Sequence, residues 1–164
     1  MIELTRMKKK LIRASIGIGV CLLIGFLSSA ATEAAMTGWF SNLEKPGFTP
    51  SKDIFKIAWA ISYILMGIAA GLVWSKGFYH KWVKVALYHF GFQLILTASW
   101  PIFFFGLQNT LFGLLNAIGL FILVLYTIKW FRIVSDTAVK FMYPYAAWII
   151  FVLVLNFEIW RLNM

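Results

Sequence analysis

Five apolar segments of the sequence are each long enough to cross the hydrocarbon core of a membrane as a helix, which takes about 20 mostly apolar residues. These segments are Leu11–Ala31, Ile54–Trp74, Trp82–Phe105, Leu111–Trp130 and Phe141–Trp160. They are too long for the strands of a membrane barrel, and their apolar residues do not alternate with polar ones. The sequence therefore predicts an all-α integral membrane protein, a bundle of five transmembrane helices.

The composition excludes the soluble classes of protein. Hydrophobic residues make up 62% of the chain, charged residues only 13%, and the mean hydropathy is +0.84. Soluble domains average about 45–50% apolar and about 25% charged residues, and a disordered chain needs low hydrophobicity and high charge. We expect a multi-pass protein of a bacterial cell membrane, surrounded by lipids, without nucleic acid as a partner. The composition fits a mitochondrial membrane as well.

The basic residues predict the orientation in the membrane. One side of the five segments carries Arg6, Lys8, Lys9, Lys10, Arg13, Lys76, Lys81, Lys84, Lys129, Arg132 and Lys140. The other side carries Lys45, Lys52, Lys56 and Arg161. Because cytoplasmic loops are enriched in Lys and Arg, we expect the N-terminus in the cytoplasm and the C-terminus outside.

One long connection, residues 32–53, joins the first two segments on the outer side. Loops longer than about 12–15 residues are usually functional or disordered. This loop contains the run MTGWFSNLEKPGFTPSKD, which is rich in aromatic residues and proline, so it is predicted to be ordered. We expect it to belong to a single membrane domain over residues 1–164.

The sequence offers little metal or acid–base chemistry. It has one cysteine, two histidines and no glycine-rich phosphate loop, so we expect no metal site. Glu33 and Glu158 lie near helix ends, where they can reach the interface. This gives little support to ion-coupled transport. His89 lies nearer the cytoplasmic side and is more typical of an interhelical hydrogen bond than of an iron ligand.

Tryptophans lie toward both predicted sides of the membrane. The sequence has eight tryptophans, and an interfacial aromatic belt explains most of them. It does not explain Trp148, which lies about 10 Å inside the last segment at the rise of an α-helix. Trp59 and Tyr63 share one helix face, as do Gln93 and Thr97.

Two prolines predict where helices bend or begin, and a pair of glycines predicts where two helices pack. Pro101 lies within the third segment and should kink it, opening space near Phe103 and the two phenylalanines after it. Pro144 can start the fifth helix. Gly67 and Gly71 form a GxxxG pattern, a weak signal of a helix-packing face.

These features predict an aromatic cavity near the outer face, covered by the long loop. A flat apolar ligand would stack on its rings, and Lys45, Lys52 or Arg161 at the rim could pair with acidic groups. A porphyrin with its propionates fits this description. A flat sterol-like or drug-like molecule fits it too.

Four ordered motifs resemble the translocator protein / tryptophan-rich sensory protein (TspO/MBR) family. They are WFSNLEKPGFTP at 39–50, WAISYILMG followed by LVW at 59–74, QL through WPIFFFG at 93–106, and PYAAW followed by LNFEIWRLN at 144–163. These runs are similar to the family patterns WYxxLxKPxWxPP, WxxxYxxMGxAxxLVW, QLxLNxxWxPxFFG and PYxxWxxFxxxLNxxIWxLN. The chain departs from them at Phe40, Phe48, Ser51, Thr97 and Phe157. The last change breaks a sterol-recognition pattern.

The resemblance implies a five-helix protein, commonly a homodimer, that binds porphyrins and benzodiazepine-type ligands beneath the first loop. The ligand-binding positions carried over are Trp39, Pro46, Pro50, Trp59, Tyr63, Phe104, Trp148 and Asn156, with Gln93, Thr97, Trp100 and Phe103 as further candidates. No cofactor is obligatory, and protoporphyrin IX or haem would be the ligand.

Three functions follow as alternatives. The first is a porphyrin-binding receptor, sensor or translocator. The second is a light- and oxygen-dependent enzyme that degrades porphyrin, with Trp59 and Trp148 as its candidate catalytic residues. The third is a structural protein that binds lipids or a partner through Gly67 and Gly71.

Overall fold

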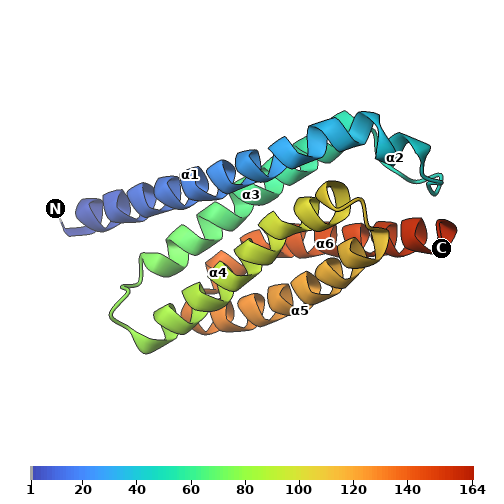
Figure 1. Ribbon diagram of the computed structural model, residues 1–164. Coiled ribbons are helices and arrows are strands. Elements are labelled where there is room, and N and C mark those ends of the chain that lie inside the picture. Colours follow the sequence, from blue (N-terminus) through green and yellow to red (C-terminus); the bar gives the residue numbers. More distant parts are fainter. Residues whose placement is uncertain (1) are drawn as a thin grey trace.

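The computed structural model describes the backbone of residues 2–164, and the side chains of all of these except 2–3, 5–6, 30–31 and 33–37. The prediction for Glu33 therefore lies outside the described side chains. The five long helices are α1 (Ile2–Thr37), α3 (Lys52–Trp74), α4 (Lys81–Pro101), α5 (Thr110–Val134) and α6 (Asp136–Leu162). They run alongside one another, and the two termini lie at opposite ends of the bundle (Figure 1).

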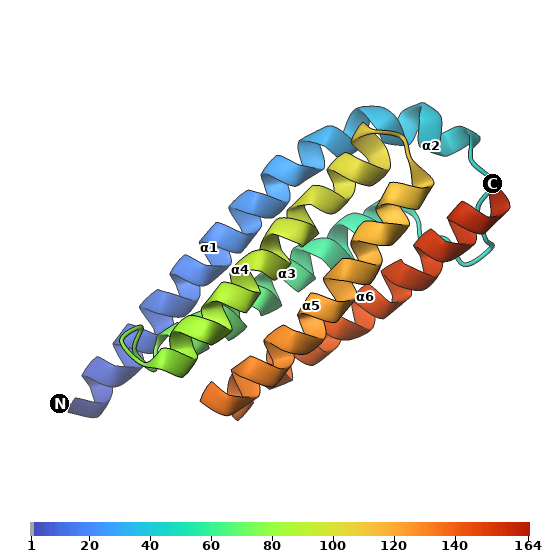
Figure 2. The same ribbon diagram turned by 60° about the horizontal axis from the view of Figure 1, so that its bottom comes forward.

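The order of helices around the bundle differs from their order in the chain. α1 packs on α3, α3 on α6, α6 on α5, α5 on α4, and a smaller contact between α4 and α1 closes the ring (Figure 2). Ser51, Asn109 and Ser135 cap the N-termini of α3, α5 and α6. Each side chain accepts a hydrogen bond, 3.0 to 3.4 Å long, from the backbone N–H three residues further on.

Four helices of the described chain are long and apolar enough to span a membrane. They are residues Met7–Ser29 within α1, and the whole of α3, α5 and α6. The predicted third span, α4, is not among them. It carries Lys81, Lys84, His89 and Gln93, which lower its hydropathy, although it packs lengthwise against α5.

The α1–α3 seam uses the GxxxG pattern within the chain. A Cβ atom on Gly71 would overlap the backbone of Ala14, and one on Gly67 would overlap the backbone of Ile18. The two helices therefore touch backbone to backbone, as small residues allow. This corrects the hypothesis that Gly67 and Gly71 form a surface for lipids or a partner, because α1 of the same chain already covers them.

The outer connection is shorter than the predicted loop 32–53. α1 continues to Thr37, and a short helix, α2 (Trp39–Asn42), follows it. The extended part is held to the C-terminal end of α6, since Asn163 exchanges two hydrogen bonds with the backbone of Glu44, at 2.9 and 3.0 Å. These bonds join segments far apart in the sequence.

The two proline sites behave differently. α4 ends at Pro101, and a π-helical turn, η1 (Ile102–Gly106), follows directly, as expected for a helix perturbed by proline. Pro144 does not start a helix: α6 begins eight residues earlier, and Pro144 lies exposed inside it. Ser135 provides the N-terminal cap, so a proline is not needed for initiation.

Candidate functional site

A cavity of about 270 Å³ lies beneath α2 and the loop that follows it. Six predicted site residues line it: Lys45, Pro50, Lys52, Trp100, Phe104 and Asn156. They come from the loop, α3, α4, η1 and α6, so the cavity exists only where these elements meet. We name it the loop cavity.

A second cavity, of about 430 Å³, lies between α1, α3 and α4. We name it the seam cavity. Trp59, Tyr63 and Thr97 line it, together with Trp100, which also lines the loop cavity. The positions predicted to form one pocket are thus divided between two neighbouring spaces.

Trp100 is held in place both by ring packing and by a hydrogen bond. It is 3% exposed, and its ring stacks on Phe104 and on Trp59 with centroids 5.4 and 5.9 Å apart. Its Nε1–H donates to Asn156 Oδ1 at 3.2 Å, and Asn156 in turn donates to the Val152 carbonyl at 2.7 Å. Asn156 therefore orients Trp100 through a buried hydrogen bond.

Trp59 and Trp148 carry indole donors without an acceptor. Their rings meet edge to face at 6.2 Å. Neither buried Nε1–H has a hydrogen-bond partner among the described residues. A buried donor left unpaired costs about 1–3 kcal/mol, so an acceptor supplied by a ligand would remove that cost. Trp148 also stacks on Phe151 at 5.1 Å and lines neither cavity.

Gln93 and Thr97 lie deeper in the bundle, and both are fully buried. Gln93 Nε2 donates to the sulfur of Met66 at 3.3 Å, and Gln93 lines neither described cavity. Thr97 Oγ1 lies 2.9 Å from the Tyr145 hydroxyl and donates to the Gln93 carbonyl. The contact between Thr97 and Tyr145 links α4 to α6.

We expect Tyr145→Phe to lower the free energy of unfolding by about 1 kcal/mol, because it removes one buried hydrogen bond. Thr97→Val removes the same bond from the other side. A double-mutant cycle on thermal unfolding in detergent should show that the combined variant loses less than the two single variants together. If the losses in unfolding free energy were strictly additive, Thr97 and Tyr145 would not be coupled.

Besides Gln93 and Trp148, four more predicted positions lie outside both cavities. Trp39 packs its ring edge on Phe104, with centroids 5.6 Å apart, behind the cavity wall. Pro46 shapes the loop, since its carbonyl accepts from the Thr49 N–H and hydroxyl at 3.0 and 2.7 Å. Phe103 is 36% exposed and points outward, because consecutive residues of a helical turn face different directions. Arg161, the fourth of these positions, lies on the exposed surface next to Glu158.

The predicted rim charges are already engaged. Arg161 pairs with Glu158 at 2.6 Å, one turn away on the exposed surface. The Lys45 ammonium donates to three backbone carbonyls at 2.8 to 3.1 Å around the end of α2, and lies over the Phe40 ring. A ligand carboxylate at Lys45 would share the ammonium with these carbonyls.

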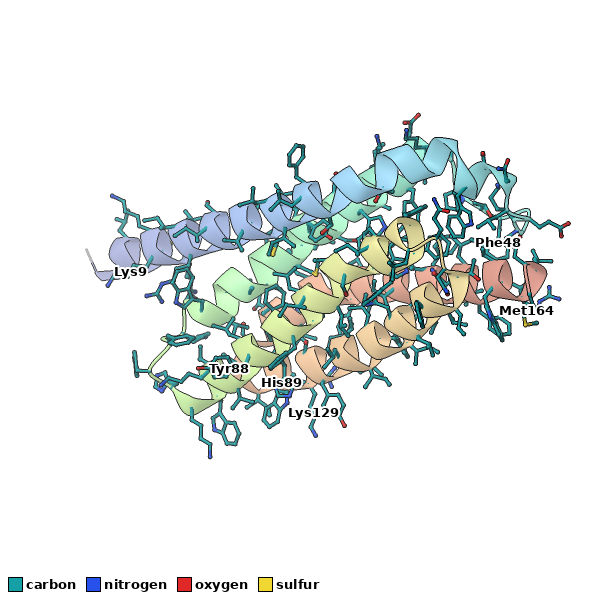
Figure 3. All side chains as sticks on the ribbon, viewed as in Figure 1. Lys9, Phe48, Tyr88, His89, Lys129 and Met164 are labelled. Carbon is teal, nitrogen blue, oxygen red and sulfur yellow. The ribbon has the colours of Figure 1, made fainter. Side chains whose placement is uncertain are left out.

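His89 lines neither cavity, and Figure 3 shows it near Lys129. Its Nδ1 lies 2.9 Å from the Val85 carbonyl of its own helix, and its ring packs against Trp130 of α5. The predicted interhelical hydrogen bond is therefore replaced by a ring contact. Within the described residues, no group of three metal-ligating side chains comes together.

Comparisons with known proteins show the family of this chain. The TspO/MBR family profile matches residues 17–161. The chain belongs to the TspO/MBR family. It is 34% identical to the tryptophan-rich protein TspO of Chlorobaculum tepidum over 96% of this chain and 99% of that relative. It is 40% identical to TspO of Archaeoglobus fulgidus over 87% and 91%, and 34% identical to the human translocator protein over 84% and 82%.

Family membership and the apolar helices together show an integral, multi-pass membrane protein. Each of the four TspO/MBR motifs contributes to the walls or packing of the two cavities. The first supplies the loop, the second Trp59 and Tyr63, the third Trp100 and Phe104, and the fourth Asn156. Residues as far apart in the sequence as Trp39 and Asn156 thus come together at one end of the TspO/MBR fold.

Sequence reasoning missed the aromatic residue at the centre of this TspO/MBR site. Phe55 lines both cavities and contacts the rings of Trp59, Trp100 and Trp148 at 5.7 to 6.3 Å. Its position four residues before Trp59 places it on the same helix face. That spacing is the signal that could have found it.

Proposed function

We propose that this TspO/MBR protein binds flat aromatic tetrapyrroles such as protoporphyrin IX or haem, as a receptor, sensor or translocator. The supporting observation is the continuous aromatic wall shared by the two cavities. Trp59, Trp100 and Phe104 form a stack with spacings of 5.4 to 5.9 Å. Benzodiazepine-type ligands are expected to use the same wall, since ring stacking does not depend on one ring system.

Polar groups around the wall match the edges of such ligands. The unpartnered indole N–H of Trp59, which lines the seam cavity, is a donor for ring or side-group acceptors. The exposed Lys45 and Lys52 line the loop cavity, where positive charge complements carboxylates. A porphyrin carries both an extended π-face and acidic groups.

The proposed topology has α4 as a fifth span, with the N-terminus in the cytoplasm and the cavities on the outer side. α4 lies alongside the other long helices and packs lengthwise on α5 (Figure 1). Lys9 and Lys129 lie toward the end of the bundle opposite Phe48 and Met164 (Figure 3), as cytoplasmic basic residues would. The proposal includes a homodimer that lies in a bacterial cell membrane.

Titration of the detergent-purified protein with protoporphyrin IX tests the proposal. In the dark we expect saturable quenching of tryptophan fluorescence. Trp59→Phe removes an indole donor that lines the seam cavity while keeping a ring, so we expect the dissociation constant to rise about threefold to tenfold. Trp148→Phe changes a ring that packs on Trp59 at 6.2 Å but lines neither cavity, so we expect a smaller rise. Trp130→Phe is the matched control, because Trp130 stacks on Trp82, away from both cavities, at 5.7 Å.

Quenching that does not saturate, and that is the same in all variants, would mean that porphyrin only partitions into the micelle, and would overturn the proposal. The titration is then repeated under light and oxygen. A new absorption band that depends on Trp59 and Trp148 would favour the degrading enzyme over a receptor.

A further inference from the structure

The loop cavity and the seam cavity are separated by two side chains. Phe55 and Trp100 are the residues that line both. Any ligand that occupies the two cavities together must move one of these rings. The structure distinguishes which of them can move.

Trp100 is fixed by a hydrogen bond and by close packing. It is 3% exposed, it donates to Asn156, and it stacks between Trp59 and Phe104. Rotation of its ring would leave both the indole N–H and the Asn156 oxygen without a partner inside the bundle.

Phe55 has only ring contacts to lose. It lies in the first turn of α3, is half-buried, and has no polar side-chain atom. Its three aromatic contacts are tilted or edge-on, at 5.7 to 6.3 Å. A change of its χ1 rotamer breaks no hydrogen bond, because its backbone N–H keeps its bond to the Ser51 carbonyl at 3.0 Å.

The volumes indicate why such a movement matters. Pockets for drug-sized ligands measure about 300–1,000 Å³. The loop cavity, at about 270 Å³, lies below this range, and the seam cavity, at about 430 Å³, lies near its lower end. Joined, they fall within it, with the Trp59–Trp100–Phe104 stack as a continuous wall.

We propose that Phe55 is a movable partition that sets the size of ligand this site accepts. With Phe55 in the observed position, each cavity takes a small aromatic group. With Phe55 swung aside, one site takes a macrocycle. This inference rests on the proposed function and names a specificity-determining residue for it.

Two substitutions at Phe55 test the partition against a large and a small ligand, protoporphyrin IX and diazepam. Phe55→Ala removes the ring that the macrocycle must displace, so we expect its affinity to rise about fivefold relative to that of diazepam. Phe55→Trp enlarges the partition, and we expect the same ratio to fall about fivefold. Phe55→Leu replaces the alanine variant if that variant is not monodisperse.

Phe151→Ala and Phe151→Trp are the matched controls. Phe151 is half-buried in the same aromatic cluster and stacks on Trp148, yet it lines neither cavity. Its substitutions should leave the affinity ratio unchanged. If the Phe55 variants change both affinities by one common factor, the partition is wrong while the proposed function stands. If the wild-type protein binds porphyrin without saturation, both the partition and the proposed function are wrong.

Discussion

Gly71→Leu is expected to separate α1 from α3 and to destabilise the protein by about 3 kcal/mol, the upper part of the usual range for overpacking. The reason is the neighbour that the new side chain would meet. A Cβ at Gly71 overlaps backbone atoms of Ala14 and Arg13, which cannot rotate away as a side chain tip can. The seam would have to open along its length, since Gly17 also sits against the backbone of Gly67.

Thermal unfolding in detergent, followed by size-exclusion chromatography, measures this effect. A loss of about 3 kcal/mol corresponds to a fall in Tm of about 10 °C for a chain of this length. Gly19→Leu is the control on α1, because a Cβ built at Gly19 faces open space and meets no other helix. An unchanged Tm for Gly71→Leu, with a changed oligomeric state, would place Gly71 between chains and contradict the seam.

Trp100→Ala is expected to cost about 3–5 kcal/mol of stability, as large-to-small changes of buried aromatics do, and to abolish saturable porphyrin binding. The side chain lines both cavities and stacks on Trp59 and Phe104. Its removal also leaves Asn156 Oδ1 without the indole donor. Stability and binding are thus lost together.

Two further variants separate these contributions. Trp82→Ala removes an indole that is 48% exposed and stacks on Trp130, so it should cost far less stability and leave binding intact. Trp100→Phe keeps a ring but removes the donor to Asn156. We expect it to retain weakened binding, with a loss of about 1–3 kcal/mol from the unpaired oxygen. Full porphyrin affinity in Trp100→Ala would show that the ligand binds elsewhere.

Local features of the sequence were enough to predict most of the helices. The apolar run predicts a helix at 54–74, and α3 spans 52–74, because a long apolar run is a local signal. The fourth apolar run predicts a helix at 111–130, and α5 spans 110–134. The ordered motifs also identified the family without any three-dimensional information.

The predicted helix boundaries were wrong where a local sequence signal is compatible with more than one structure. Pro144 is compatible with a helix start or a helix interior, and the Ser135 cap decided for the interior. Residues 32–37 read as loop but continue α1. The third span stays a prediction: the hydropathy of α4 is lowered by residues such as Gln93, whose partner Met66 the sequence does not reveal.

The amino-acid sequence by itself determined the class of protein, the helices and the aromatic residues from which a site could be built, because hydropathy, capping and motif spacing act over a few residues. Only the tertiary structure decided that Gly67 and Gly71 face α1, that Phe103 and Arg161 point away, and that Phe55 stands between two cavities. These outcomes depend on which helix faces pack together, and such contacts join residues far apart in the chain.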